Sequence, residues 1–252
     1  MCASWRANHF LIHFSFIFHF MPTILAIETS TELASVALLR AGMTLSRESS
    51  GAQTHSMTVL GMVQELLAEA DIALSSCDAI AFGSGPGSFT GARTACGLTQ
   101  GLAFGAKLPV IPIVTLLAMA EAARQQFHAQ HVIPVLDARM AEVYSAEYAF
   151  DDGPSHEWKI ISAPTLSAAS EVALTSTAIV CGNGLTAYES DFHHLNKSQC
   201  YPTIMPHAKE IAQLAARAWL RGEHCHPRDA SPLYLRNKVA LTTNERLAGA
   251  QK

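Results

Sequence analysis

Two carboxylates stand where this chain could do acid–base chemistry. Glu28 ends an apolar segment near the start of the chain, and Asp137 ends a second apolar segment. If the two side chains faced each other across a cleft, they could exchange a proton with a substrate. The alternative, which the pattern favours, is that both are held in structural hydrogen bonds. Arg139 could bind an anion, or form a salt bridge with Asp137 or Glu142.

A glycine-rich run, GSGPGSFTG over 83–91, follows an apolar strand that ends at Phe82. Ser88 or Thr90 could cap the helix expected over 90–105 by accepting bonds from the free N–H groups of its first turn. Such a loop can bind an anion at the helix N-terminus. It lacks the Gly-Lys-Ser/Thr ending of a nucleotide P-loop, so the pattern favours a tight strand-to-helix turn.

The spacing of histidine and cysteine indicates no metal centre. Two histidines four residues apart on a helix would share one face and could bind a metal. His55 stands at the start of the helix expected over 56–70, but Val59, four residues on, has no ligand atom. Histidine and cysteine, which can bind metals, also stand at 193–194 and 224–226, but neither group has a second cluster of ligands at a clear spacing. No Gly-x-Ser-x-Gly sequence supports a hydrolase.

The elements that must position these residues alternate between strands and helices, which predicts an α/β fold with mixed sheets. Strands are expected over 23–28, 34–40, 43–47, 78–82, 110–114, 132–137, 142–150 and 178–182, and helices over 56–70, 90–105, 116–126 and 208–221. A turn is expected at Asn183 and Gly184, and 156–166 is ambiguous. The apolar strand that ends in an acid recurs at Asp137, so we expect two related lobes.

The expected units are an N-terminal lobe, 21–126, and a C-terminal lobe with a tail, 127–252, whose helix 208–221 could pack back on the first lobe. Residues 1–20 are interpreted as a non-native extension before a start at Met21. Their apolar stretch is too short to span a bilayer and has no small-residue cleavage site. A membrane-associating extension is the alternative.

Composition narrows the class of protein. The 252 residues are 49% hydrophobic, enough for one or two cores. The net charge is −4, from 17 basic and 21 acidic residues, without a long basic run, so any RNA contact is expected to be shared with a partner. The six cysteines form no CxxC pair and indicate free thiols in a reducing cytoplasm.

Small and apolar residues dominate two of the expected helices. In 90–105 the only charged residue is Arg93, and each interior glycine costs about 1 kcal/mol relative to alanine. Close approach to a sheet or to another chain could offset that cost, so we expect this helix to be buried on most sides. With 56–70 it is expected to form a protein interface. The candidate interface residues are Met57, Leu60, Val63, Leu67, Gly91, Ala95, Gly97 and Gly101.

Four segments carry a resemblance that covers most of the chain. They are ILAIETST at 24–31, GPGSFTG at 85–91, DARMAEVY at 137–144 and YLRN at 234–237. In this combination and order the chain resembles the bacterial TsaB family, formerly called YeaZ. The resemblance implies two ribonuclease-H-like lobes of the actin-like ATPase and sugar-kinase type, the second of them degenerate. It also implies a non-catalytic, cytoplasmic scaffold or dimerisation subunit in the synthesis of N6-threonylcarbamoyladenosine beside the tRNA anticodon.

The resemblance further implies the partners. A larger catalytic paralogue, TsaD, pairs with the first lobe, an ATPase, TsaE, joins the pair, and a second copy takes the place of TsaD when it is absent. ATP and metal then belong to the partner subunits, tRNA is met only through the complex, and no membrane is involved.

Nucleotide-binding proteins of this fold hold phosphates with Asp-x-Gly-Thr turns, whose glycine lets backbone N–H groups come close. The corresponding turns here, 28–31 and 137–139, have no glycine. We therefore expect a degenerate nucleotide site with no catalytic residue, in which Glu28, Asp137 and Arg139 remain candidates for cofactor contact. The alternative function is a stand-alone small kinase or ATPase using Glu28, Asp137 and the loop 83–91. A metallopeptidase lacks its ligands, and the segment 234–237 could contact RNA or dock the tail.

Overall fold

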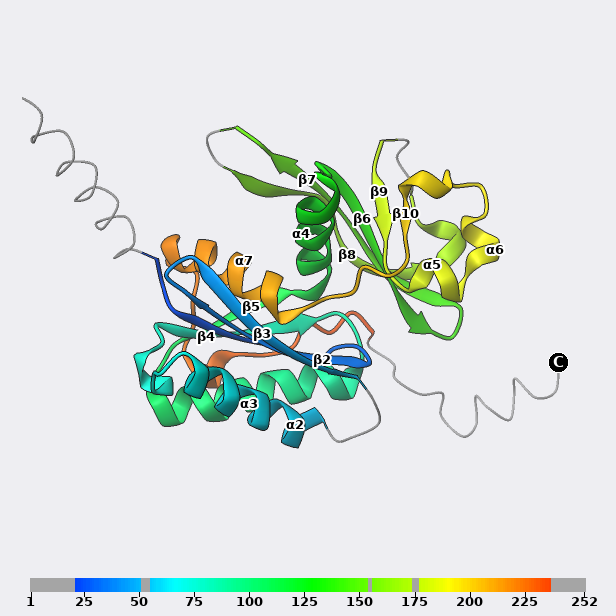
Figure 1. Cartoon of the computed structure of the whole chain (residues 1–252). Helices are drawn as coiled ribbons and strands as arrows, with labels where there is room; N and C mark the ends of the chain where they lie inside the picture. Colours follow the sequence, from blue (N-terminus) through cyan, green and yellow to red (C-terminus); the bar gives the residue numbers. More distant parts are fainter. Residues whose placement is uncertain (1–20, 51–54, 154–155, 174–176, 237–252) are drawn as a thin grey trace, which may run out of the picture.

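The computed structural model describes residues 21–50, 55–153, 156–173 and 177–236. They build two five-stranded mixed sheets with helices around them, so the predicted α/β class is confirmed (Figure 1). The expectation of a non-native extension at 1–20 falls outside the described residues, as does Asn237. No helix within the described ranges combines the length and apolar character needed to cross a membrane.

The first sheet has the strand order β3-β2-β1-β4-β5. Its strands are β1 (Ile24–Glu28), β2 (Leu33–Arg40), β3 (Met43–Ser50), β4 (Ala79–Gly85) and β5 (Val110–Val114). β2 runs antiparallel to both β1 and β3, whereas β1, β4 and β5 are parallel. All five strands lie within a few residues of the predicted ranges.

The second sheet repeats this plan with the order β8-β7-β6-β9-β10. Its strands are β6 (His131–Arg139), β7 (Glu142–Asp151), β8 (Glu157–Ala168), β9 (Ile179–Cys181) and β10 (Cys200–Tyr201). β6 is antiparallel to β7 and parallel to β9, as β1 is to β2 and β4. The predicted relation between the two lobes is therefore confirmed, and Glu28 and Asp137 lie near the ends of equivalent strands.

Helices cover both faces of the first sheet (Figure 1). α2 (His55–Glu69) and α3 (Phe89–Ala106) pack on one face, and α7 (Ala208–Leu220) packs on the other. Alternate residues of β1 serve the two layers, since Leu25 and Ile27 face α2 and α3 whereas Ile24 and Ala26 face α7. A strand buried on both faces reads as a continuous apolar run, which is why β1 was recognisable from its residues alone.

The second sheet is covered by α4 (Thr115–Phe127) on one face and by two short helices, α5 (Gly184–Ala187) and α6 (Glu189–Phe192), on the other. The 3-10 turns are Leu74–Ser76, Ala169–Glu171, Lys197–Gln199 and Pro227–Asp229. Helix α5 begins where only a turn was expected. The ambiguous segment 156–166 is strand β8, whose exposed Ile160 and Ile161 break the alternation that marks a half-buried strand.

Helix α3 differs from expectation in its burial. Its N-terminus is capped as predicted, because the Ser88 side chain accepts a hydrogen bond from the Gly91 N–H at 3.3 Å. The helix is not buried on most sides, however. Its buried residues are Gly91, Ala92, Ala95, Cys96, Thr99 and Ala103, whereas Gly97, Gly101, Phe104 and Gly105 are exposed. The prediction of burial failed because the side chains of glycine and alanine are too small to distinguish a buried helix face from an exposed one.

Candidate functional site

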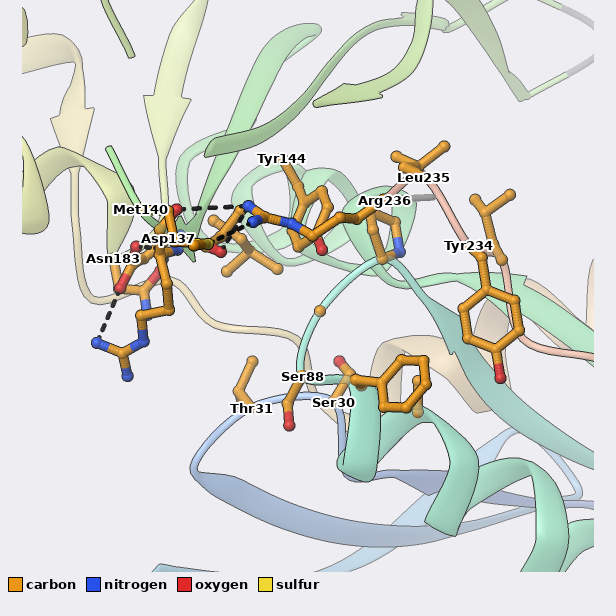
Figure 2. Close-up of a pocket in the computed structure, with 18 of the residues that line it drawn as sticks. Ser30, Thr31, Ser88, Asp137, Met140, Tyr144, Asn183, Tyr234, Leu235 and Arg236 are labelled. Atoms are coloured by element: carbon orange, nitrogen blue, oxygen red, sulfur yellow. Dashed lines mark hydrogen bonds and ion pairs between the residues drawn. The ribbon is translucent and has the colours of Figure 1, made fainter. Parts of the chain in front are cut away.

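A cavity of about 470 Å³ opens between the two lobes (Figure 2). The first lobe contributes Ser30 and Thr31 from the turn after β1, and Ser88 from the loop before α3. The second lobe contributes the turn after β6, and the C-terminal segment 233–236 closes one side. The walls of the cavity therefore come from the turns and loops that the sequence analysis named as candidates for binding.

The glycine-rich loop packs against the chain's own turn after β1. A Cβ on Gly91 would lie 1.9 Å from the carbonyl oxygen of Thr29, and one on Gly87 would lie 2.6 Å from that of Ser30. The Ser88 N–H donates to the Ser30 carbonyl at 2.7 Å, and the Thr29 hydroxyl donates to the Gly91 carbonyl at 2.7 Å. These glycines therefore allow close contact between two turns of the same lobe.

Glu28 is fully buried beneath the loop, not at the cavity wall. Its carboxylate accepts hydrogen bonds from the Ser30 N–H at 2.5 Å and from the Thr115 hydroxyl at 3.3 Å. Gly83 leaves the space that this carboxylate fills, since a Cβ there would lie 1.7 Å from Glu28 Oε2. Burial raises the pKa of Glu28 above its usual 4.5, although the hydrogen bonds oppose that shift.

The raised pKa of Glu28 predicts a pH-dependent stability. Folding favours the protonated carboxyl, so this contribution is complete below about pH 4.5 and is lost as the pH rises through the folded-state pKa. Glu28→Gln keeps the shape and the neutral form. We expect the melting temperatures of the two proteins to coincide at low pH and the variant to melt higher at neutral pH. A constant difference across the pH range would contradict this assignment.

Asp137 lines the cavity but is already bound to its neighbours. Its carboxylate accepts from the Tyr188 hydroxyl at 2.9 Å and forms an ion pair with Arg139 at 3.1 Å. Arg139 also reaches Glu32 of the first lobe at 3.4 Å. Of the alternatives for Arg139, the structure thus has the salt bridge with Asp137.

Of the two alternatives for Glu28 and Asp137, the structure has the favoured one, because both carboxylates are held in structural hydrogen bonds and do not face each other across the cleft. Asp137 borders the cavity, whereas Glu28 points into the protein beside Gly83. Asn183 and Tyr188, which hold the Asp137 backbone and carboxylate, were not predicted because nothing in their local pattern marks them.

The segment 233–236 ties the two lobes together at this cavity (Figure 2). The Leu233 N–H donates to the Ser84 carbonyl of β4 at 2.7 Å, and Tyr234 accepts a hydrogen bond from Arg93 of α3 at 2.8 Å. Leu235 packs on the core of the second lobe, and Arg236 forms an ion pair with Glu142. Of the two roles considered for this segment, docking the tail is the one that these contacts show.

Arg236 holds an unusual turn between β6 and β7. Three consecutive non-glycine residues have a positive φ: 65° at Arg139, 59° at Met140 and 62° at Ala141. Left-handed conformations of such residues are costly and persist only where the surroundings impose them. The Arg236 guanidinium, 16% exposed, donates to the Ala138 carbonyl at 3.1 Å and to the Arg139 carbonyl at 3.4 Å, next to its ion pair with Glu142.

Removing this guanidinium should loosen the turn. We expect Arg236→Ala to cost about 2 kcal/mol, since hydrogen bonds to charged groups contribute roughly 1.5–3 kcal/mol. Amide hydrogen exchange across 138–142 should accelerate in the variant. The control is Arg228→Ala, whose exposed side chain pairs only with its neighbour Asp229 in the described structure. Unchanged exchange in Arg236→Ala would contradict the role given to Arg236.

Candidate metal ligands do not converge in the described part of the chain, where no three His, Cys, Asp or Glu side chains are close enough to hold an ion.

The predicted interface residues divide into two groups. Val63, Gly91 and Ala95 are buried against the core of their own lobe, so these three are corrections to the prediction, whereas Leu67 is half-buried and stays a prediction. Helical spacing had placed them near the others, but the sheet occupies that side of both helices. Met57, Leu60, Gly97 and Gly101 lie on the open side, where Gly61, Phe104 and Gly105 also lie.

Comparison with known proteins gives consistent results. A family model described as TsaD, tRNA N6-adenosine threonylcarbamoyltransferase, matches residues 48–242. The tRNA threonylcarbamoyladenosine biosynthesis protein TsaB of Haemophilus influenzae is 40% identical over 86% of this chain and 94% of its own length. TsaB of Escherichia coli is 35% identical over 86% of this chain and 96% of its own length. The structure of YeaZ from Pseudomonas aeruginosa is 38% identical, with a TM-score of 0.77 over 85% of this chain and 100% of that one.

The repeated sheets define a two-lobed protein with the actin-like, ribonuclease-H-like ATPase fold. Within that class, this chain belongs to the TsaB family, formerly called YeaZ. The resemblance inferred from its four sequence segments is confirmed.

Proposed function

We propose that this chain is a non-catalytic scaffold subunit in the synthesis of N6-threonylcarbamoyladenosine in tRNA. It binds a TsaD-type catalytic paralogue through the open side of α2 and α3 and thereby activates it. The observation that carries the proposal is a run of exposed glycines on α3, Gly97, Gly101 and Gly105, at each of which an added Cβ would meet nothing within 4 Å in the described chain.

The open side of these helices carries exposed apolar side chains and uncovered glycines. Met57 on α2 is 78% exposed and Phe104 on α3 is 74% exposed. A Cβ placed on Gly61, Gly97, Gly101 or Gly105 would meet nothing within 4 Å. Both helices therefore present exposed apolar side chains together with uncovered backbone on this side.

Energetics support a partner at this surface. Each glycine within α3 costs about 1 kcal/mol relative to alanine, and in this chain no close packing at Gly97 or Gly101 offsets that cost. A partner helix that approached the bare backbone would offset it. We infer that the glycines keep this surface low enough for such an approach.

The contacts at the interlobe cavity support a role without catalysis by this chain. Glu28 is buried, and Asp137 and Arg139 are paired with each other. The space beside the loop glycines is occupied by the first lobe's own turn. These side chains serve the packing of this chain, so ATP and metal are proposed to belong to the partner subunits.

We propose the remaining partners on the basis of the family to which the chain belongs. A TsaE-type ATPase joins the pair, tRNA is met through the complex, and a second copy of this chain occupies the α2–α3 surface when the paralogue is absent. The complex is proposed to work in the cytoplasm.

The test is reconstitution with the TsaD-type paralogue of the same host. Threonylcarbamoyl transfer to tRNA is measured with each protein alone and with both together, and complex formation is followed by size exclusion. We expect activity only in the mixture, with a stable heteromer. Nucleotide turnover or transfer by this chain alone would overturn the scaffold role and support the stand-alone kinase or ATPase.

A further inference from the structure

Two aromatic rings and a guanidinium form a compact stack at the N-terminal end of α3. The guanidinium carbon of Arg93 lies 3.6 Å from the centre of the Phe89 ring and 5.5 Å from that of Tyr234. The Arg93 Nε donates to the Tyr234 hydroxyl at 2.8 Å. Phe89 is 39% exposed and Tyr234 is 45% exposed, so the stack remains open to solvent.

The stack continues the line of exposed glycines on α3. Residues four apart on a helix are surface neighbours, and Phe89, Arg93, Gly97 and Gly101 follow one another at that spacing. All four are exposed. A partner lying over the glycines would therefore meet the stack at the end of the same surface.

Arg93 is the only charged residue of α3, and its charge is not paired within the described ranges. Its Nε is used by Tyr234, whereas its terminal nitrogens, Nη1 and Nη2, have no hydrogen-bond partner among the described residues. A guanidinium fixed in this way presents a planar pair of donors that matches a carboxylate.

We propose that the Phe89–Arg93–Tyr234 stack is the anchor for an acidic side chain of the partner chain. The partner's carboxylate accepts hydrogen bonds from Arg93 Nη1 and Nη2, while neighbouring apolar groups of the partner pack on the two rings. This inference rests on the proposed function and deepens it, because it names the charge that the partner must present at the end of the α2–α3 surface.

The stack is preorganised, which favours strong binding. Ordering a flexible side chain at an interface costs about 0.5–1.5 kcal/mol, and contacts with Phe89 and Tyr234 already restrain Arg93 in the isolated chain. Arginine and tyrosine are also enriched among the residues that dominate binding energy at protein interfaces. Arg93 is therefore expected to contribute more than an ordinary surface charge.

The charges around the stack favour a protein carboxylate over RNA phosphate. Arg139 and Arg236 line the neighbouring cavity, but Glu32 and Asp137 line the same cavity and Glu142 pairs with Arg236. A surface with balanced charge does not supply the cationic field that phosphate binding requires.

The anchor also depends on the C-terminal segment. Tyr234 lies against α3 in a segment that is held by the Leu233 hydrogen bond to β4 and by the Arg236 ion pair with the second lobe. Residues more than a hundred positions apart in the sequence thus complete one surface.

The test measures the affinity of the full chain for the same host's TsaD-type paralogue by calorimetry at two salt concentrations. We expect Arg93→Ala to weaken binding about tenfold or more, and Arg93→Lys to restore only part of the loss because lysine lacks the planar fork. Tyr234→Phe should weaken binding severalfold, since Arg93 loses the hydroxyl that orients it. Lys159→Ala, an exposed cation on β8 of the second lobe, is the control and should leave the affinity unchanged.

The outcomes separate the two proposals. If wild type binds and Arg93→Ala binds within twofold of it, the anchor is overturned and the scaffold role stands. If wild type does not bind the paralogue, the scaffold role and the anchor both fail. If Arg93→Ala binds the paralogue normally but binds tRNA more weakly, with a reduced salt dependence, the stack is an RNA contact and the anchor is overturned. Melting curves of each variant verify folding.

Discussion

Gly83→Ala is expected to destabilise the protein by about 3 kcal/mol, within the range for overpacking a core. The new Cβ would lie 1.7 Å from Oε2 and 2.6 Å from Cδ of Glu28. That carboxylate cannot move freely, because it is fully buried and accepts hydrogen bonds from Ser30 and Thr115. For a chain of this size the melting temperature should fall by roughly 6–12 °C.

A double-mutant cycle tests the cause of this loss. In a Glu28→Ala background the carboxylate is gone, so Gly83→Ala should cost less than about 1 kcal/mol, which is the mark of coupled neighbours. Gly97→Ala is the matched control. It adds the same methyl group where nothing lies within 4 Å, and should stabilise the helix by roughly 0.5–1 kcal/mol. An equal penalty for Gly83→Ala in both backgrounds would show that the carboxylate is not the obstacle.

Gly97→Leu is expected to abolish pairing with the catalytic paralogue, and with it threonylcarbamoyl transfer by the mixture. The leucine side chain would project from the middle of the exposed face of α3 and hold a partner helix away from the backbone. The isolated chain should fold normally, since the position is open and leucine is a better helix former than glycine. Size exclusion of the mixed proteins and the melting temperature of the variant measure these two effects separately.

A graded series strengthens the second prediction. Gly97→Ala should weaken pairing less than Gly97→Leu, and the same ordering should hold at Gly101. An exposed glycine elsewhere, Gly222, serves as the control because a Cβ there also meets nothing within 4 Å. Its positive φ of 75° makes Gly222→Ala strained within the chain, so it should lower stability without affecting pairing. A Gly97→Leu protein that still forms the complex would place the partner on another surface.

The strands and most helices were predictable because the spacing of their apolar residues reflects which side chains are buried. β1 was recognised from its continuous apolar run and α7 from its helical spacing, and both lie where expected. β8 was not recognised because it lies at the edge of its sheet with long stretches exposed. Solvent on both faces removes the selection for alternation, so its pairing with β7 depends on the rest of the sheet.

The site was predictable only in part. The motifs around Glu28, the loop 83–91, Asp137 and the segment 234–237 were identified, and the structure brings Ser30, Ser88, Asp137 and Tyr234 to one cavity. The direction of the Glu28 side chain was not predictable, because it depends on the space left by Gly83 in a neighbouring strand. The partner of Arg236 was equally hidden, since Glu142 lies 94 residues earlier in the chain.

By itself, the sequence determined the class of fold, the relation between the two lobes and the family, because local propensity, the order of elements along the chain and short motifs can all be read from neighbouring residues. Only the tertiary structure decided which side chains meet. In the folded chain Glu28 points away from Asp137, the interior glycines of α3 are exposed, and Tyr234 accepts a hydrogen bond from Arg93. Those outcomes depend on long-range packing, in which a residue's surroundings come from strands and helices that are distant along the chain.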